Sequence, residues 1–341
     1  MLNIRRPAHS GLVPNQSEWK RLTQNEIDIL QNYLSYNTIQ SLQKKVDAQP
    51  TKLIGYYRSM GVSGVFIKVL SKQNHQLQTS AEKIASWLHH VGLSVNCVRD
   101  GFPKKIVEHS LWIFAYDYID YEFSNISKEK LISIGKEIGH MHRLMKEYPD
   151  RENVRMRGTK KNQILFEQLN KVKLDRVSLN FSESAIKLIK ETSDSDYQLL
   201  TLGAQMVHGD MNYGNVLFNK VNNQPIIIDF EDATTAWLSP LYDLAFVIQR
   251  FILLHGHKDS YELASALIRG YKSQNTLSKT RKLNTLFIMI KMISIRSLLI
   301  LSMLPKEEQM LYLDEVDKFV YLYGKAHDDF NLISGIDDLI N

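Results

Sequence analysis

Residues 207–218 read VHGDMNYGNVLF and residues 225–230 read PIIIDF, and these two stretches decide how the chain is interpreted. They supply Asp210, then Asn215 five positions later, then Asp229 fourteen positions further on. Phosphoryl transfer needs such a set. One carboxylate orients the attacking hydroxyl and accepts its proton, while an amide oxygen and a second carboxylate hold the magnesium ion that neutralises a triphosphate.

The same stretches predict a β-hairpin. VLF at 216–218 and PIIIDF at 225–230 are short apolar runs, and the polar KVNNQ at 220–224 separates them as a turn. Asp210 then lies in a loop ahead of the first strand, and Asp229 ends the second strand. We expect both carboxylates to face one cleft.

With HGD at 208–210, Asn215 and IDF at 228–230, the sequence resembles the aminoglycoside phosphotransferase and choline kinase superfamily, whose members are relatives of the protein kinases. The resemblance covers about residues 45–260. It implies that Asp210 is the catalytic base or orienting group, and that Asn215 and Asp229 bind Mg²⁺. It also implies structural support for the loop from His208 and from Asp243 in SPLYDLA.

The resemblance further implies a nucleotide site upstream. Lys68 in the strand-like VFIKVL would bind the α- and β-phosphates of ATP, held by an ion pair with Glu82 fourteen positions later. Backbone groups from Asp117 to Ile119 would bind the adenine edge. One feature departs from the family pattern: the loop expected to cover the phosphates, residues 47–51 (DAQPT), contains no glycine.

The predicted fold class is α+β, a two-lobed protein-kinase-like fold with a small β-rich N-lobe and a larger helical C-lobe. We expect an N-terminal helical extension at 1–45, an N-lobe at 46–118 and a C-lobe at 119–341. Periodicity supports this division. Strand-like runs lie at 41–48, 51–59, 65–70, 95–98 and 111–119, and helical runs lie at 24–35, 79–90, 127–147, 163–191 and beyond 241.

Composition is that of an ordinary globular chain of 341 residues, with 44% hydrophobic and 23% charged residues and a net charge of +5. Cys97 is the only cysteine, which excludes an internal disulfide and a cysteine-based metal cluster. No concentrated basic stripe predicts nucleic-acid binding. The apolar run 283–304 contains Lys291 and Arg296, and each charge near a bilayer centre costs about 3 kcal/mol, so we expect a core helix in a cytoplasmic protein.

The acceptor is expected to be a small molecule bound near Tyr213, Glu231, Asp232 and Trp237. Acidic and aromatic side chains favour a cation such as an aminoglycoside-type antibiotic or an amino alcohol. The alternative is that the two acids are solvated loop charges and that Trp237 is a core residue. The choice between ATP and GTP, and the oligomeric state, are left open.

Two other classes of protein remain as alternatives. A catalytically silent kinase-fold binding or structural protein has no physical need for Lys68, Glu82, Asp210, Asn215 and Asp229 together. A protein kinase needs a long activation segment, and only fourteen residues separate Asp229 from Asp243. The sequence therefore favours a small-molecule kinase.

Overall fold

The chain divides into two units in the computed structural model, which describes residues 19–45, 53–60, 63–121, 126–256, 258–277 and 284–340. One unit is built on a β-sheet and contains the described residues from 19 to 121 together with Val216–Glu231. The other is mainly helical and contains the remaining described residues from 126 onward. This mixed architecture, with a β-rich N-terminal part and a helical C-terminal part, confirms the predicted fold class.

A six-stranded antiparallel sheet forms the core of the first unit, in the order β1-β2-β3-β4-β6-β5. Strand β4 is apolar except for Lys68 and Ser71, and Lys68 stands opposite Phe114 of β6. The strands are β1 (Trp19–Arg21), β2 (Gln43–Lys45), β3 (Gly55–Ser59), β4 (Val65–Ser71), β5 (Lys104–Ile106) and β6 (Leu111–Asp117).

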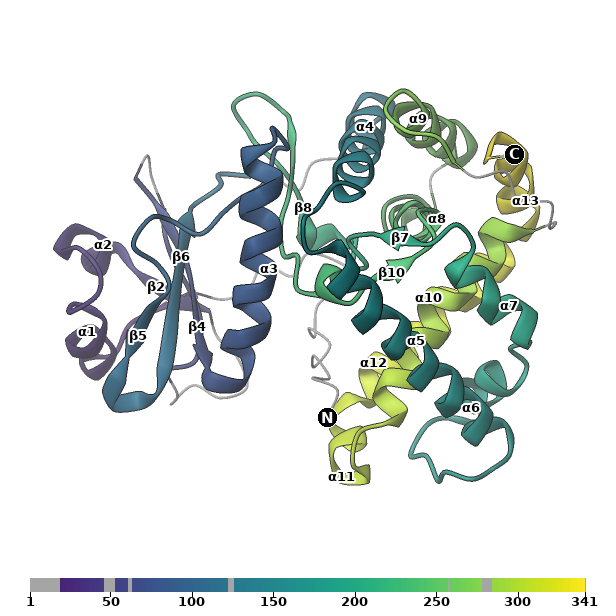
Figure 1. Ribbon diagram of the computed structural model, residues 1–341, viewed down its shortest axis with the longest axis horizontal. Helices are drawn as coiled ribbons and strands as arrows, with labels where there is room; N and C mark the ends of the chain where they lie inside the picture. The colour runs from purple at the N-terminus through teal and green to yellow at the C-terminus, as the bar shows by residue number, and fades with distance from the viewer. Residues whose placement is uncertain are drawn as a thin grey trace. The chain divides into compact units, whose positions relative to one another are not determined.

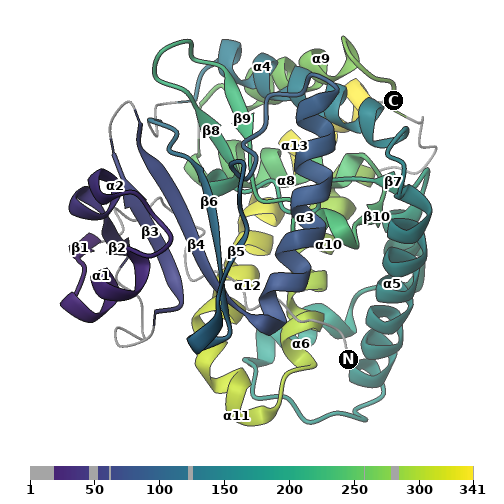
Figure 2. The same ribbon diagram turned by 60° about the vertical axis from the view of Figure 1, so that its left-hand side comes forward.

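Helices cover both faces of this sheet. Figures 1 and 2 show α3 (Lys72–His90) along one face, with α1 (Gln24–Leu30) and α2 (Tyr36–Ser41) on the opposite side. Leu30, Ile39 and Leu42 pack into one apolar cluster with Ile67 and Ile113 of the sheet. Since side chains alternate along a strand, the odd-numbered residues of β4 enter that cluster and Lys68 points to the α3 side.

The hairpin of β8 (Val216–Phe218) and β9 (Pro225–Ile227) forms as predicted. It belongs to the sheet unit, because Val95 bridges to Ile227 and Tyr121 bridges to Asn219. The predicted C-lobe of residues 119–341 did not anticipate this, since backbone pairing over such a separation in sequence leaves no local signal.

The helical unit contains a pair of closely packed helices, α4 (Lys128–Met145) and α9 (Ser260–Lys272). A Cβ atom at Gly135 would lie only 2.1 Å from the backbone oxygen of Leu267, so the approach requires glycine. The other elements are α5 (Arg151–Lys173), α6 (Glu183–Lys190), α7 (Asp194–Gln198), β7 (Gln205–Met206), β10 (Trp237–Leu238), α8 (Leu241–Val247), α10 (Thr285–Ser302), α11 (Lys306–Gln309), α12 (Leu313–Asp328) and α13 (Phe330–Ile340).

Helix α10 is the apolar run that was predicted to be a core helix. Among the described residues it is the one helix with the length and hydropathy to cross a membrane, yet 78% of its window is buried inside the protein. Arg296 donates to Asn162 Oδ1 at 2.7 Å, and Lys291 lies 3.7 Å from Asp196. Both charges that interrupt the run are therefore partnered within the fold.

Several predicted boundaries were wrong. The expected helix at 79–90 begins at Lys72, directly after β4, and the expected helical region 163–191 is two helices, α5 and α6. Strands β1, β5, β7 and β10 were not predicted, because each has only two or three residues and depends on its partner strand. The glycine-poor loop at 47–51 lies outside the described residues.

Candidate active site

A buried carboxylate fixes the loop that carries Asp210. Asp243 on α8 is fully buried, and its Oδ2 and Oδ1 accept the backbone N–H groups of His208 at 2.8 Å and Gly209 at 2.9 Å. His142 Nε2 on α4 lies 2.9 Å from the same Oδ2. Burial by itself would raise the pKa of Asp243, but the hydrogen bond and charge of His142, the charge of His208 and the Gly209 N–H lower it overall. The carboxylate thus fixes this loop through two backbone hydrogen bonds, and its supporting role in catalysis stays a prediction.

Gly209 cannot be replaced without strain at this position. Its φ is +84°, in the region that L residues rarely adopt. A Cβ atom would lie 2.8 Å from the Cβ of Ala236, and Ala236 is held in place because its carbonyl accepts Val207 N–H at 3.1 Å. The loop can therefore turn sharply only with glycine between His208 and Asp210.

The Asp210 carboxylate is oriented by two amide side chains. Asn212 Nδ2 donates to both carboxylate oxygens at 3.0 Å, and Asn215 Nδ2 donates to Oδ2 at 3.0 Å and to the Asp210 carbonyl at 2.8 Å. Both donors are neutral amides that fix the direction of the carboxylate, and the role of Asp210 as acceptor of a hydroxyl proton stays a prediction. Asn212 was not predicted, although its position inside the motif, two residues after Asp210, was the available signal.

The sheet unit carries a second polar cluster, centred on Lys68. Its Nζ donates to Gln78 Oε1 at 3.1 Å and lies 3.4 Å from Asp229 Oδ1 and 3.3 Å from Glu231 Oε1. Lys68 is therefore a buried cation that faces two carboxylates and a helix amide. The two carboxylates balance the charge of the ammonium, and the role of Lys68 in binding phosphate oxygens stays a prediction.

Glu82 belongs to the same cluster, and the structure connects it to Lys68 through Gln78. Gln78 Nε2 donates to Glu82 Oε1 at 2.7 Å, and the Tyr116 hydroxyl donates to the same oxygen at 2.7 Å. Burial raises the pKa of Glu82, although these bonds and the charge of Lys68 oppose the rise. A direct pair between Lys68 and Glu82 in a nucleotide complex stays a prediction. Gln78 lies one helical turn before Glu82, a spacing from which the sequence offered a signal.

Asp229 has an unusual backbone conformation. Its φ is +66°, in the left-handed region that aspartate tolerates better than most residues but still at a cost of about 1 kcal/mol or more. Such conformations concentrate at functional sites, where the side chain must point in a direction that regular structure does not allow. Strand β9 ends at Ile227, and the carboxylate of Asp229 lies 3.4 Å from Lys68 Nζ.

The two predicted magnesium ligands have suitable atoms. The amide nitrogen of Asn215 is used by Asp210, so its oxygen Oδ1 is the atom that remains for a cation. Asp229 offers a carboxylate. Oxygen atoms of these two types are what Mg²⁺ prefers in proteins, usually with waters and phosphate oxygens completing the shell. Within the described residues no group of three or more His, Cys, Asp or Glu side chains forms a metal site.

The predicted hinge lies at the end of β6. The Asp117 carbonyl accepts from Asn96 Nδ2 at 2.9 Å, and its carboxylate pairs with Arg99 at 2.7 Å. Tyr118 N–H donates to the Gly64 carbonyl at 3.0 Å. Adenine binding by the backbone from Asp117 to Ile119 stays a prediction.

Of the four predicted acceptor residues, Tyr213 is placed against the helical unit. Its ring stacks on Phe251 with centroids 4.0 Å apart and meets His255 edge-on at 5.3 Å. Asp232 lies 3.6 Å from Lys161, in the same unit. Glu231 belongs to the Lys68 cluster of the sheet unit. Both acidic candidates therefore face lysines.

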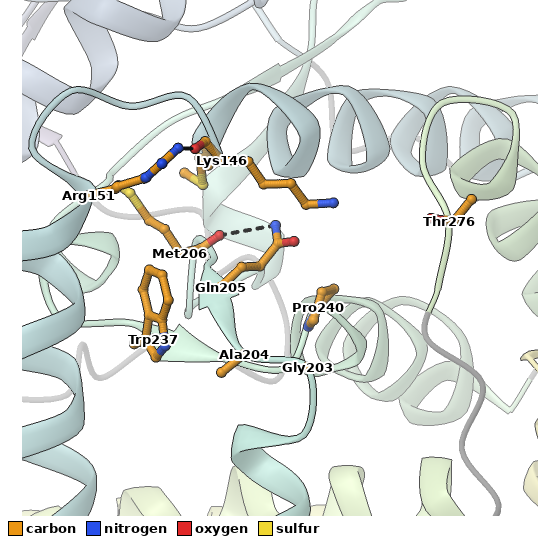
Figure 3. Close-up of a pocket in the computed structure, with 10 residues that line it drawn as sticks. Lys146, Arg151, Gly203, Ala204, Gln205, Met206, Trp237, Pro240 and Thr276 are labelled. Atoms are coloured by element: carbon orange, nitrogen blue, oxygen red, sulfur yellow. Dashed lines mark hydrogen bonds between the residues drawn. The ribbon is translucent and has the colours of Figure 1, made fainter.

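Trp237 lines a different pocket, of about 380 Å³, in the helical unit. Figure 3 shows Trp237 beneath Met206, with the Lys146 side chain extending across the opening and Gln205 at its centre. Gln205 Nε2 donates to the backbone carbonyl of His142 at 2.9 Å, so this pocket residue contacts the histidine whose side chain lies against Asp243. The pocket is lined by Met145, Lys146, Arg151, Gly203, Ala204, Gln205, Met206, Trp237, Pro240 and Thr276.

Residues 117–283 match the family model described as "Phosphotransferase enzyme family". This region contains the loop of Asp210 (residues 208–210), together with Asn215, Asp229 and Asp243. No curated protein matches the sequence.

Solved structures of small-molecule kinases are similar in fold. A spectinomycin phosphotransferase bound to AMP is 14% identical, with a TM-score of 0.56 over 92% of this chain and 98% of that one. An amicoumacin kinase in complex with AMP-PNP, Ca²⁺ and Ami is 13% identical, with a TM-score of 0.54 over 88% and 93%. A GDP complex of an aminoglycoside 2′-phosphotransferase is 13% identical, with a TM-score of 0.57 over 91% and 99%. At such identities the similarity concerns the fold.

Proposed function

We propose that this protein transfers the γ-phosphoryl group of ATP to a hydroxyl of a small molecule. The proposal proceeds from its being a small-molecule kinase of the phosphotransferase enzyme family, which is related to the aminoglycoside phosphotransferases and choline kinases. The observation that carries this proposal is the hydrogen-bonded geometry of Asp210. Its carboxylate is oriented by Asn212 and Asn215, and its loop is anchored by the buried Asp243. A silent scaffold would gain nothing from orienting a carboxylate in this way.

In this mechanism Asp210 binds the acceptor hydroxyl, directs its oxygen toward the phosphorus atom and takes the proton as the bond to phosphorus forms. Positioning supplies much of the rate, because phosphoryl transfer proceeds through a loose transition state that needs alignment more than strong nucleophile activation. The two amide donors keep the carboxylate from rotating away.

Lys68 would bind phosphate oxygens of the nucleotide from the sheet unit. Its neighbours Asp229 and Glu231 hold the ammonium in place, and Gln78 and Glu82 support it from α3. Mg²⁺, when bound, would neutralise the triphosphate, and Asn215 and Asp229 are the residues that would hold it.

The acceptor belongs to the class of hydroxyl-bearing small molecules. A cationic acceptor was favoured by four residues, but Glu231 faces Lys68 and Asp232 faces Lys161. Among the aromatic candidates, Tyr213 lies three residues after Asp210 and stacks on Phe251, and Trp237 lines the separate pocket of the helical unit. A cationic acceptor such as an aminoglycoside or an amino alcohol is therefore a candidate to be compared with neutral and acidic acceptors on equal terms.

The test is an ATP-consumption screen over aminoglycosides, amino alcohols, homoserine and methylthioribose, with Asp210→Asn as the matched inactive variant. We expect Mg²⁺-dependent phosphorylation of at least one acceptor by the wild type and a loss of about 10²-fold or more in the variant. Calorimetric titration with ATP, with and without Mg²⁺, runs alongside. A wild-type protein without Mg²⁺-dependent ATP binding would establish the alternative, a catalytically silent kinase-fold protein.

A further inference from the structure

The pocket lined by Trp237 has the size of a small-molecule site. Its volume of about 380 Å³ lies within the range of about 300–1,000 Å³ that is typical of ligand pockets. All the residues that line it belong to the helical unit. It shares no residue with the cluster of Asp210 or with that of Lys68, so a ligand here would be additional to the phosphoryl-transfer site.

One wall of the pocket is apolar and its backbone is held in place. Trp237 of β10 is paired with Met206 of β7, and the Trp237 carbonyl accepts from Asn162 Nδ2 at 3.0 Å. A Cβ atom at Gly158 would lie only 2.6 Å from the Cβ of Trp237, so α5 packs directly against this strand. A preformed wall of this kind lowers the entropy cost of binding a flat apolar group.

The charged residues of the pocket are both cations. Of the described residues that line it, Lys146 and Arg151 are charged and none is Asp or Glu. Figure 3 shows the Lys146 side chain extending across the opening, on the far side of the pocket from Trp237. The pocket therefore favours an anionic ligand.

These two cations are only weakly compensated by the protein. Lys146 Nζ donates to Asn275 Oδ1 at the long distance of 3.5 Å, and no carboxylate of the described chain pairs with it. Arg151 Nη1 donates to the Lys146 carbonyl, and Glu147 lies 4.0 Å from Arg151 with its side chain 79% exposed. A carboxylate or phosphate entering the pocket would therefore not have to displace a close ion pair.

Gln205 at the centre of the pocket does not change this charge. It is buried, and its Nε2 donates to the backbone carbonyls of His142 at 2.9 Å and Met206 at 3.4 Å. Because its N–H groups are used within the fold, recognition of an anion falls to Lys146 and Arg151.

We propose that this pocket binds a small organic anion, a carboxylate or phosphate carried by an aromatic or other apolar group. The apolar group would lie against Trp237 and Met206, and the anionic group would contact Lys146 and Arg151, which suit carboxylate and phosphate oxygens. A cation could be attracted by the Trp237 ring alone, but it would meet two like charges in this pocket. The inference does not depend on the proposed function.

The test uses para-nitrobenzoate as the probe, with para-nitrobenzyl alcohol and para-nitrobenzylamine as neutral and cationic analogues. A nitro-substituted ring quenches tryptophan fluorescence, and calorimetry gives an independent Kd. The other tryptophans, Trp19, Trp87 and Trp112, belong to the sheet unit, so Trp237→Phe identifies the signal of the pocket. We expect saturable binding of para-nitrobenzoate with a Kd of about 1 mM or lower, and binding of both analogues at least about tenfold weaker.

Variants assign the binding to the two cations. The double variant Lys146→Met and Arg151→Met should weaken para-nitrobenzoate binding by about tenfold, whereas Lys146→Arg with Arg151→Lys should keep it within about threefold. Lys68→Met, a change in the other polar cluster, should leave the Kd unchanged. If the double variant unfolds, the single change Lys146→Met at an exposed side chain should still weaken binding by about threefold.

Four results would overturn the proposal. They are the absence of saturable binding, binding of the alcohol or the amine as tight as that of the acid, an unchanged Kd without the two cations, and loss of binding in Lys68→Met. The assay contains neither ATP nor an acceptor. A wild-type protein that phosphorylates nothing in the screen would therefore refute the proposed function and leave the outcome of this test intact.

Discussion

Asp243→Asn isolates the anchor of the catalytic loop, because it keeps the size of the side chain and removes one acceptor. In the wild type, Oδ2 accepts from His208 N–H and contacts His142, while Oδ1 accepts from Gly209 N–H. If the asparagine oxygen takes the place of Oδ2, its amino group meets the Gly209 N–H. If the oxygen takes the place of Oδ1, the amino group meets the His208 N–H. Either rotamer leaves one backbone donor facing another donor.

The loss of folding free energy in Asp243→Asn follows from these hydrogen bonds. A buried hydrogen bond to a charged group is lost and a donor is left unsatisfied, which together amount to about 3 kcal/mol. For a unit of this size that corresponds to a fall in Tm of roughly 6–12 °C. Turnover should fall by about 10²-fold if Asp210 moves by roughly 1 Å. ATP binding without Mg²⁺ should change little, because Lys68 belongs to the sheet unit.

The pH dependence gives a second readout. The pKa of Asp243 is lowered in the folded protein, so its stabilisation is present above the pKa of an unfolded aspartate, about 3.9, and is lost as pH falls through the folded-state value. The difference in stability between wild type and Asp243→Asn should therefore be constant between about pH 6 and 8 and shrink below about pH 4. Thermal unfolding with Asp328→Asn as an exposed control measures it. Equal Tm and equal turnover in Asp243→Asn and wild type would refute the anchoring role.

Three further predictions concern the two polar clusters. Asp210→Asn should lower turnover by about 10²-fold or more with ATP affinity nearly unchanged, whereas Asp229→Ala should also weaken Mg²⁺-dependent ATP binding; calorimetry and turnover separate the two, and equal effects would contradict the assigned roles. Gly209→Ala should destabilise the protein by about 1–3 kcal/mol, because a Cβ atom would clash with Ala236 at 2.8 Å and φ is +84°; an unchanged urea midpoint would be inconsistent with this strain. Lys68→Met should raise the KM for ATP by about tenfold or more and leave the acceptor KM nearly unchanged; the opposite pattern would remove Lys68 from the nucleotide site.

The sequence was sufficient for features encoded over short distances. The β8–β9 hairpin followed from two apolar runs around a polar turn. The chemical roles of Asp210, Asn215 and Asp229 stay predictions. The sequence was insufficient where partners are far apart in the chain. His142 reaches Asp243 over 101 positions and Lys68 reaches Asp229 over 161, and no local pattern specifies such pairs.

Arg250 shows the same limit from another direction. In the sequence it is a single charge inside the apolar run LAFVIQRFILL, which reads as an interruption of a helix. Its burial, its place in the π-helical segment Ile248–Ile252 and two nitrogens without a hydrogen-bond partner among the described residues are properties of the packed protein, which periodicity cannot report.

The division of the hairpin from the loop before it has a consequence for heat inactivation. Asn215 ends the segment of the helical unit that carries Asp210, and Val216 begins the segment that carries Asp229 to the sheet unit. Under the proposed function, the contacts of Lys68 and Asp229 with a nucleotide would need only the sheet unit to be folded, whereas the Mg²⁺ contact of Asn215 and turnover would need the helical unit as well. On warming, turnover would therefore be lost at the melting temperature of the weaker unit, and nucleotide binding without Mg²⁺ would outlast it whenever that unit is the helical one.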